Sequence, residues 1–226
     1  MAPPIELHYW PTSNGHKIPI ALEEMGLAYR VTPVNIDEGQ QFQPSFLAIS
    51  PNNRIPAIID PEGPDGKPIS VFESGAILQY LVRKTGLFYP ADARQQVQVD
   101  EWLFWQVGGL GPMAGQAHHF RGKHVADQRQ IAYAANRYTA ETHRLYGVLE
   151  RRLAGRDYIC GELSIADMAC WPWINSWTKQ AIDLADYPGV AAWRERLQAR
   201  PSVQAALRLG VEVRAGRVSP DQIQGG

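Results

Sequence analysis

The chain has 226 residues, of which 45% are hydrophobic, and its 22 lysines and arginines almost balance its 23 aspartates and glutamates. This balance gives no long-range attraction to nucleic acid or to an anionic membrane, and no apolar run approaches the roughly 20 residues of a membrane-spanning helix. The chain begins without the basic and apolar regions of a secretion signal, and two cysteines are too few for a disulfide framework. We therefore expect a cytoplasmic protein that binds neither nucleic acid nor membranes.

The composition of the chain changes near residue 90. Up to that point short apolar runs alternate with helical stretches, and beyond it nearly every segment has a helical pattern. A proline lies between the two patterns, which is typical of a linker. We therefore predict a first domain over residues 1–87, a linker over 88–94, an all-helical domain over 95–213 and a mobile tail over 214–226.

The first domain has the pattern β-α-β-α-β-β-α. Two parallel strands joined by a helix, followed by a helix and an antiparallel hairpin, form a thioredoxin-like layout. Pro33 predicts that the second strand lies at a sheet edge, because proline cannot donate to a strand ladder. The predicted strands are Ile5–Trp10, Tyr29–Asn35, Ala57–Asp60 and Ile69–Phe72, and the predicted helices are 18–25, Pro44–Ile49 and Glu73–Thr85.

The second domain is predicted to consist of long helices. One spans about 93–119 and is expected to bend or break at the glycine run 108–112, and the next spans about 127–153. Ser164 and Asp167 precede an apolar run and have the spacing of a capping box, with Asp in place of Glu. We assign this pair to helix nucleation and not to catalysis. The predicted fold class is α+β, with a thioredoxin-like domain followed by an all-α domain.

Pro11-Thr-Ser-Asn-Gly15 lies between the first strand and the first helix. Backbone N–H groups at a helix start favour an anion, and Thr12 and Asn14 add a hydroxyl and an amide as donors. Taken alone, the segment is more simply explained as a helix cap formed by Ser13 or Asn14. The segment by itself leaves both interpretations open.

Two further segments have the same ambiguity. Pro56 is expected to be cis in a thioredoxin-like unit, which turns the backbone of Ile55 toward a peptide ligand, although an ordinary trans turn is the simpler expectation. Ser74 at a helix start suits a carboxylate and Glu73 suits an ammonium group, although a plain cap explains both equally well. Together the three segments describe a short peptide with a thiol in its middle and a free amino-acid head. Glutathione has this structure.

Longer motifs resemble those of the cytosolic glutathione transferases, and in particular the bacterial Nu class, along almost the whole chain. The Glu-Ser and Ile-Pro elements belong to the whole superfamily, whereas Trp-Gln-Val-Gly-Gly-Leu-Gly-Pro is much more particular. The resemblance implies the glutathione transferase fold and a homodimer. The motifs are Thr12-Ser-Asn-Gly-His-Lys, Ser50-Pro-Asn-Asn-Arg-Ile-Pro-Ala, Phe72-Glu-Ser-Gly-Ala-Ile-Leu, Trp102-Leu-Phe-Trp-Gln-Val-Gly-Gly-Leu-Gly-Pro-Met and Ser164-Ile-Ala-Asp-Met-Ala-Cys-Trp-Pro-Trp.

The resemblance also implies roles for the matching positions. Thr12 and Asn14 would stabilise the sulfur of bound glutathione and are the catalytic candidates. For Arg54 the physical expectation agrees, since glutathione carries two carboxylates. The implied glutathione-binding positions are Gln41 and Arg54 at the glycyl carboxylate, Ile55 and Pro56 at the cysteinyl backbone, Glu73 and Ser74 at the γ-glutamyl head, and Arg137 from the helical domain, across a dimer interface.

The predicted reaction depends on a thiolate, and donors at a helix N-terminus raise the thiolate share of a bound thiol. No cysteine precedes Cys160, so glutathione would supply both thiols for a disulfide reduction. We predict glutathione-dependent reduction of small organic disulfides, with weaker conjugation to electrophiles or peroxide reduction. Reduced or oxidised glutathione is the expected co-substrate, and no metal is expected. The alternative is a non-catalytic glutathione-binding regulator, because a fungal nitrogen regulator has this fold together with an Asn-rich arm.

Histidines and cysteines offer two weaker candidates. His118, His119 and His124 hint at a metal, but no further ligands lie at fixed spacing, so a polar patch is the simpler interpretation. Cys160 and Cys170 flank the capping box and are interpreted as packing residues and not as a redox pair.

Overall fold

The computed structural model describes residues 3–122 and 128–225. Its contacts divide the chain into two compact units, of which the first contains Met1–Leu87 and Arg200–Gly226 and the second contains Phe88–Ala199. The chain thus leaves the first unit after residue 87 and returns to it at residue 200. The predicted helical domain 95–213 therefore includes a helix that the structure assigns to the first unit.

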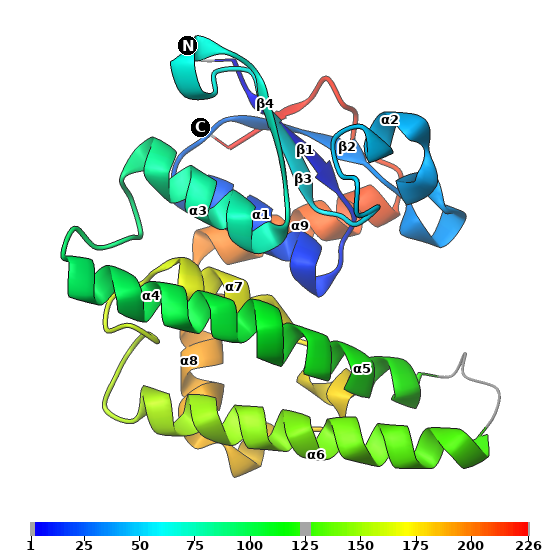
Figure 1. Cartoon of the computed structure of the whole chain (residues 1–226), viewed down its shortest axis with the longest axis vertical. Helices are drawn as coiled ribbons and strands as arrows, with labels where there is room; N and C mark the ends of the chain where they lie inside the picture. The colour runs from blue at the N-terminus through cyan, green and yellow to red at the C-terminus, as the bar shows by residue number, and fades with distance from the viewer. Residues whose placement is uncertain (1–2, 123–127, 226) are drawn as a thin grey trace. The chain divides into compact units, whose positions relative to one another are not determined.

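A five-stranded mixed sheet forms the centre of the first unit (Figure 1). Strand β1 is parallel to β2, antiparallel to β3, and β3 is antiparallel to β4. This arrangement confirms the thioredoxin-like prediction. The strands are β1 (Ile5–Tyr9), β2 (Tyr29–Pro33), β3 (Ala57–Asp60), β4 (Ile69–Phe72) and β5 (Ile223–Gln224), in the spatial order β4-β3-β1-β2-β5.

The placement of β2 at a sheet edge is wrong, because β5 adds a further strand beside it. Strand β5 pairs only with Tyr29 and Arg30, at the start of β2. Pro33 lies at the other end of β2 and therefore need not donate to β5. The predicted mobile tail, 214–226, is the segment that supplies β5.

Four α-helices belong to the first unit, and α1 packs against both α3 and α9. Ile18, Ala21 and Leu22 lie on one face of α1 and are completely buried, as their spacing predicts. Gly26 has φ 62°, a left-handed conformation that suits glycine where α1 ends. The helices are α1 (Ser13–Glu24), α2 (Pro44–Leu47), α3 (Ser74–Thr85) and α9 (Pro201–Arg214), and 3₁₀ turns cover Ile36–Glu38, Gln40–Phe42 and Pro64–Gly66.

The second unit is all-helical (Figure 1). The glycine run does not break the long helix predicted over 93–119. Instead, the helical stretch continues through one π-helical turn, Gln106–Leu110, which lies between α4 and α5. Such wide turns often occur at functional sites. The helices are α4 (Ala93–Trp105), α5 (Gly111–Arg121), α6 (Gln128–Leu153), α7 (Ile165–Ile174) and α8 (Pro188–Gln198), with 3₁₀ turns at Trp177–Gln180 and Leu184–Asp186.

The capping box at the start of α7 is confirmed. The carboxylate of Asp167 is fully buried and accepts hydrogen bonds from the Ser164 N–H at 3.0 Å and the Ile159 N–H at 2.9 Å. The indole N–H of Trp193 on α8 donates to the same carboxylate at 2.9 Å. Because a buried carboxylate needs several donors, Asp167 joins α7, α8 and the loop before α7 into one core.

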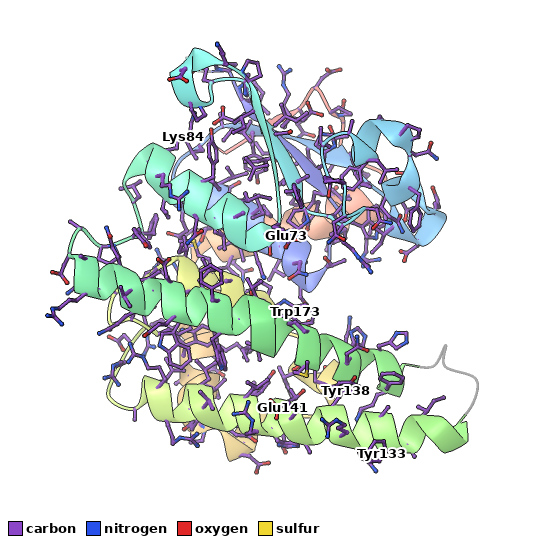
Figure 2. All side chains as sticks on the ribbon, viewed as in Figure 1. Glu73, Lys84, Tyr133, Tyr138, Glu141 and Trp173 are labelled. Carbon is purple, nitrogen blue, oxygen red and sulfur yellow. The ribbon has the colours of Figure 1, made fainter. Side chains whose placement is uncertain are left out.

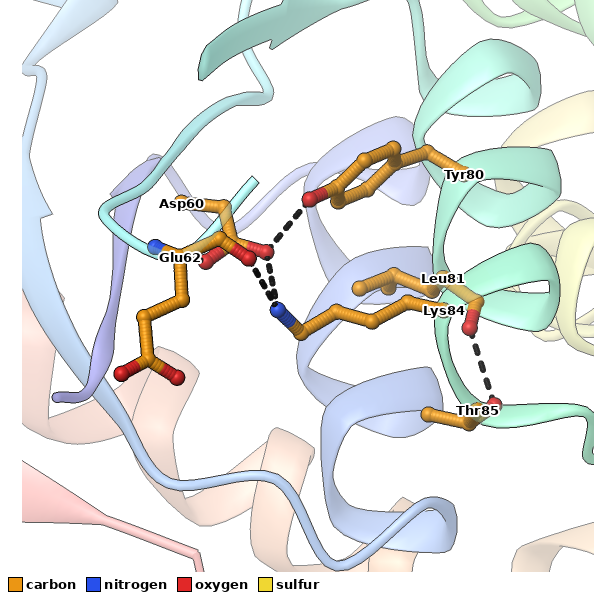
Figure 3. Close-up of polar contacts among 6 residues, drawn as sticks. All are labelled: Asp60, Glu62, Tyr80, Leu81, Lys84 and Thr85. Carbon is orange, nitrogen blue, oxygen red and sulfur yellow. Dashed lines mark hydrogen bonds and ion pairs between the residues drawn. The ribbon is translucent and has the colours of Figure 1, made fainter. Parts of the chain in front are cut away.

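A polar cluster at the end of β3 ties the sheet to α3 (Figure 3). Lys84 Nζ lies 2.7 Å from the Asp60 carboxylate and also donates to the Glu62 carbonyl at 2.7 Å, while the Tyr80 hydroxyl donates to Asp60. Burial alone would raise the pKa of Asp60, but the hydrogen bonds from Lys84 and Tyr80 outweigh it and hold that pKa below its ordinary value. We assign these residues to stability, since they anchor the C-terminal half of α3.

Over residues 3–122 and 128–225, no helix combines the length and the apolar character needed to cross a bilayer.

Candidate functional site

The register of the sheet brings the three predicted site segments together at one end of its strands. His8 of β1 is paired with Ala57 of β3, and Ala57 is paired with Phe72 of β4. Because β3 runs antiparallel to both neighbours, the C-terminal ends of β1 and β4 and the N-terminal end of β3 lie at the same end of the strands. Segment 10–14 begins two residues after His8, segment 55–56 directly precedes Ala57 and segment 73–74 directly follows Phe72, so the three segments meet there.

The cap of α1 is Thr12, so the expectation that Ser13 or Asn14 forms the cap is wrong. Its Oγ1 accepts a hydrogen bond from the Gly15 N–H at 3.1 Å, which makes it the N-cap of α1. A hydroxyl that accepts in this way keeps its own O–H as a donor. Asn14 lies in the first turn of α1, and Thr12, Ser13 and Asn14 are all half-buried. Capping therefore leaves the Thr12 O–H free to donate in principle, and its role toward an anion stays a prediction.

Close backbone contacts fix the loop that carries Thr12. A Cβ atom at Gly15 would lie 2.0 Å from the Trp10 carbonyl oxygen, so this position requires glycine. From α9, Arg214 donates to the Pro11 carbonyl at 3.0 Å, and its guanidinium lies 5.7 Å from the centre of the Trp10 ring. The sequence assigns Arg214 to a mobile tail and gives no signal for this contact, which depends on the path of α9.

The half-buried His16 and the buried Tyr9 form a polar pair next to the loop, with His16 Nδ1 3.0 Å from the Tyr9 hydroxyl. Burial lowers the pKa of His16 to about 4, and the nearby charge of Arg214 acts in the same direction, while a hydrogen bond with the Ala206 backbone opposes the change. At neutral pH His16 is therefore uncharged. Burial also raises the pKa of Tyr9, so the Tyr9 hydroxyl stays protonated.

The predicted cis peptide before Pro56 is present. Ile55 is 8% exposed and lies two residues before β3, and the Ser50 hydroxyl donates to the Arg54 carbonyl at 2.8 Å, which holds this turn. The Arg54 side chain is exposed, as a residue that reaches a soluble carboxylate must be.

Glu73 has φ 69° and ψ 116°, a conformation that non-glycine residues rarely adopt. Strained residues of this kind cluster at functional sites, where the surroundings hold them in place. The Asn52 amide donates to the Glu73 carboxylate at 3.4 Å, and Figure 2 shows Glu73 at the start of α3. The next residue, Ser74, is almost buried, and its hydroxyl accepts from Lys17 Nζ at 3.1 Å. No local pattern in the sequence signals the contact of Asn52 with Glu73 or of Lys17 with Ser74.

Gln41 lies in the 3₁₀ turn Gln40–Phe42, between β2 and α2. Its side-chain oxygen is buried and has no hydrogen-bond partner among the described residues. An unsatisfied buried acceptor is costly in a protein without a ligand. A carboxylate cannot donate to this oxygen, so the contact predicted between Gln41 and the glycyl carboxylate would have to use the amide N–H groups, and it stays a prediction.

Arg137 belongs to the second unit, where it lies on α6. It lines a pocket of about 850 Å³ together with Met113 of α5 and the α6 residues Tyr133 and Tyr138, which Figure 2 labels on that helix. Tyr133 is 74% exposed. The role of Arg137 toward glutathione stays a prediction.

Of the three candidate histidines, the structure describes only His118 and His119, at the end of α5. The His119 ring packs edge-on against Phe120 at 5.1 Å, and His124 lies outside the described residues. No group of three or more His, Cys, Asp or Glu side chains in the described ranges is arranged to hold a metal ion.

Neither cysteine belongs to the first unit, and neither forms a disulfide. Cys170 is buried within α7. Cys160 is half-buried, and burial together with the charge of Asp167 raises the pKa of its thiol. A raised pKa disfavours the thiolate, so Cys160 is a poor nucleophile.

Comparison with known families assigns both halves of the chain. Residues 3–83 match the glutathione S-transferase N-terminal domain, and residues 132–196 match the glutathione S-transferase C-terminal domain. The disulfide-bond oxidoreductase YfcG of Escherichia coli (strain K12) is 56% identical over 205 residues, which cover 90% of this chain and 94% of that protein.

Solved structures give the same assignment. A glutathione transferase from Burkholderia graminis, solved with two glutathione molecules bound per subunit, is 43% identical, with a TM-score of 0.85 over 90% of this chain and 87% of its own. One from Pseudomonas putida, solved with one glutathione disulfide bound per subunit, is 41% identical, with a TM-score of 0.84 over 91% of each chain.

Proposed function

Because the chain belongs to the glutathione S-transferase family, we propose that it uses glutathione to reduce small organic disulfides. The observation that carries this proposal is that the segments around Thr12, Ile55 and Ser74 meet at the same end of strands β1, β3 and β4. These segments offer an anion site, a peptide-backbone site and an amino-acid-head site, and none of them contains a cysteine. The reactive sulfur therefore comes from the substrate, and the protein supplies the donors that stabilise its thiolate.

Each part of glutathione has a proposed partner. The Thr12 hydroxyl and Asn14 amide donate to the sulfur, and the Ile55 backbone next to Pro56 pairs with the cysteinyl residue. Glu73 binds the α-ammonium group and Ser74 the α-carboxylate. Gln41 and Arg54 bind the glycyl end, and Arg137 adds a contact across a homodimer interface.

The reaction needs two molecules of glutathione for each disulfide. The first thiolate attacks one sulfur of the disulfide, the S–S bond breaks, and the leaving thiolate takes up a proton. The second thiolate attacks the resulting mixed disulfide and releases glutathione disulfide and the second thiol. Lowering the thiol pKa by two units needs about 2.7 kcal/mol, which two charge-assisted hydrogen bonds can supply.

The similar proteins support this reaction over others. The similar proteins include a disulfide-bond oxidoreductase and a transferase solved with glutathione disulfide bound. Weaker conjugation to electrophiles or reduction of peroxides uses the same thiolate. The homodimer, the cytoplasmic location and the lack of a metal requirement belong to the proposal as well.

Replacing the sulfur donors tests the proposed site. We expect Asn14→Ala and Thr12→Val to lower kcat for glutathione-dependent reduction of 2-hydroxyethyl disulfide by about 10-fold or more each, since each removes a donor to the thiolate. Cys160→Ala is the matched control and is expected to keep wild-type turnover. Equal losses in Asn14→Ala and Cys160→Ala would show that the site is wrong.

A second assay separates the enzyme from a glutathione-binding regulator of the same fold. Conjugation of a chloronitrobenzene is measured beside disulfide reduction, with glutathione binding measured by calorimetry. We expect disulfide reduction to be the faster reaction. Glutathione binding without activity in either assay would contradict the enzymatic proposal and favour the regulator.

A further inference from the structure

Lys17 is a buried lysine on α1 that touches the candidate site through Ser74. Only 1% of its surface is exposed, and its Nζ donates to the Ser74 hydroxyl oxygen at 3.1 Å. Lysines are rarely buried to this extent, because removing the amino group from water is costly. A methionine side chain would fill similar space without that cost, so packing alone does not account for a lysine here.

The hydrogen bond from Lys17 determines how Ser74 can be used. A lysine ammonium group has three donors and no acceptor, so the Ser74 oxygen must be the acceptor in this contact. The Ser74 O–H then remains as a donor, directed to another partner. Ser74 is also the first residue of α3, where backbone N–H groups have no acceptor within the helix. The hydroxyl, these amides and the positive charge behind them all favour an anion.

The charges around Ser74 match an α-amino acid. Glu73, the neighbouring residue, is exposed and negative, and it lies on the solvent side of the helix start. Lys17 is buried and positive, and it lies behind Ser74. A free amino-acid head has a carboxylate and an ammonium group on one carbon, so it presents the complementary pair of charges.

We infer that Lys17 is a positioning and specificity residue, which orients the Ser74 hydroxyl and makes the site selective for thiols that carry a free α-carboxylate. This inference rests on the proposed glutathione site. Lys17 itself need not touch glutathione, because it acts through Ser74. Thiol peptides without that carboxylate would gain nothing from Lys17.

The test compares glutathione with γ-aminobutyryl-cysteinyl-glycine, which lacks only the γ-glutamyl α-carboxylate. For Lys17→Met we expect KM for glutathione to rise about 10-fold or more, with kcat nearly unchanged and KM for the analogue unchanged. The preference for glutathione over the analogue should therefore fall by the same factor. A purely structural role would raise both KM values together and leave the preference intact, and that result would overturn the inference.

Lys84→Met is the matched control, since it removes another lysine hydrogen-bonded within the first unit, at the far end of α3. It is expected to lower stability while keeping the wild-type preference between the two thiols. If Lys17→Met does not fold, Lys17→Gln, which keeps an N–H donor without the charge, replaces it. The preference should again fall, and an unchanged preference overturns the inference. A wild-type protein that uses neither thiol would instead contradict the proposed function.

Discussion

His16 shows how a single residue links stability to pH. Its pKa in the folded protein, about 4, lies below the ordinary value of 6.5, chiefly because burial disfavours the charged ring. The unfolded chain therefore binds a proton at His16 in a pH range where the folded protein does not. The stabilising contribution is fully present above pH 6.5 and is lost as the pH falls toward 4. It amounts to about 3 kcal/mol at most.

Replacing His16 should flatten this pH dependence. We expect the free energy of unfolding of the wild-type protein to fall between pH 6.5 and 4. The free energy of unfolding of the His16→Gln variant should fall less steeply over that range, because about one proton fewer is bound on unfolding. Urea unfolding at intervals across this range measures both slopes. Identical slopes would show that His16 does not titrate differently on folding.

At the scale of secondary-structure elements, α9 packs against the loop that carries Thr12 and against the first turn of α1. A Cβ atom at Gly210 would lie 2.7 Å from His16 Cε1 and 3.2 Å from both the Pro11 Cβ and the Tyr9 hydroxyl oxygen. This glycine is required by close approach and not by its backbone angles. It allows α9 to lie against the first turn of α1, next to the loop at Thr12.

Adding a methyl group at Gly210 should move α9 away from that loop. We expect Gly210→Ala to cost about 1–3 kcal/mol of stability and to lower disulfide-reductase turnover, since Pro11 and His16 must shift. Gly147→Ala is the control, because its nearest neighbour is the end of the flexible Arg151 side chain at 3.5 Å. That control should be neutral or gain up to about 1 kcal/mol from helix propensity. A Gly210→Ala variant as stable and active as the control would refute the contact.

At the scale of the whole molecule, local patterns predicted strands β1 to β4 and the capping box, because each depends on residues close together in the sequence. The contribution of residues 200–226 to the first unit could not be predicted in this way. α9 has the same amphipathic pattern as any surface helix, and only its contacts with α1 identify its unit. Lys17 and Ser74 are 57 positions apart, so no local pattern joins them.

Truncation tests this division of the chain. A protein ending at Ala199 lacks α9 and β5, and we expect it to lose glutathione binding in calorimetry, because α1 loses the helix that packs against it. A protein ending at Gly216 lacks only β5 and is expected to keep binding. Undiminished binding by the shorter protein would show that the first unit does not need α9.

The location of the two cysteines has a consequence for oxidative damage. Enzymes with a reactive thiolate are inactivated when peroxide drives that sulfur irreversibly to sulfinic or sulfonic acid. The first unit contains no cysteine at all, and the half-buried Cys160 has a raised pKa, which slows its oxidation. Each sulfur that reacts at the proposed site leaves with the product, so an over-oxidised sulfur is replaced with the next molecule of glutathione.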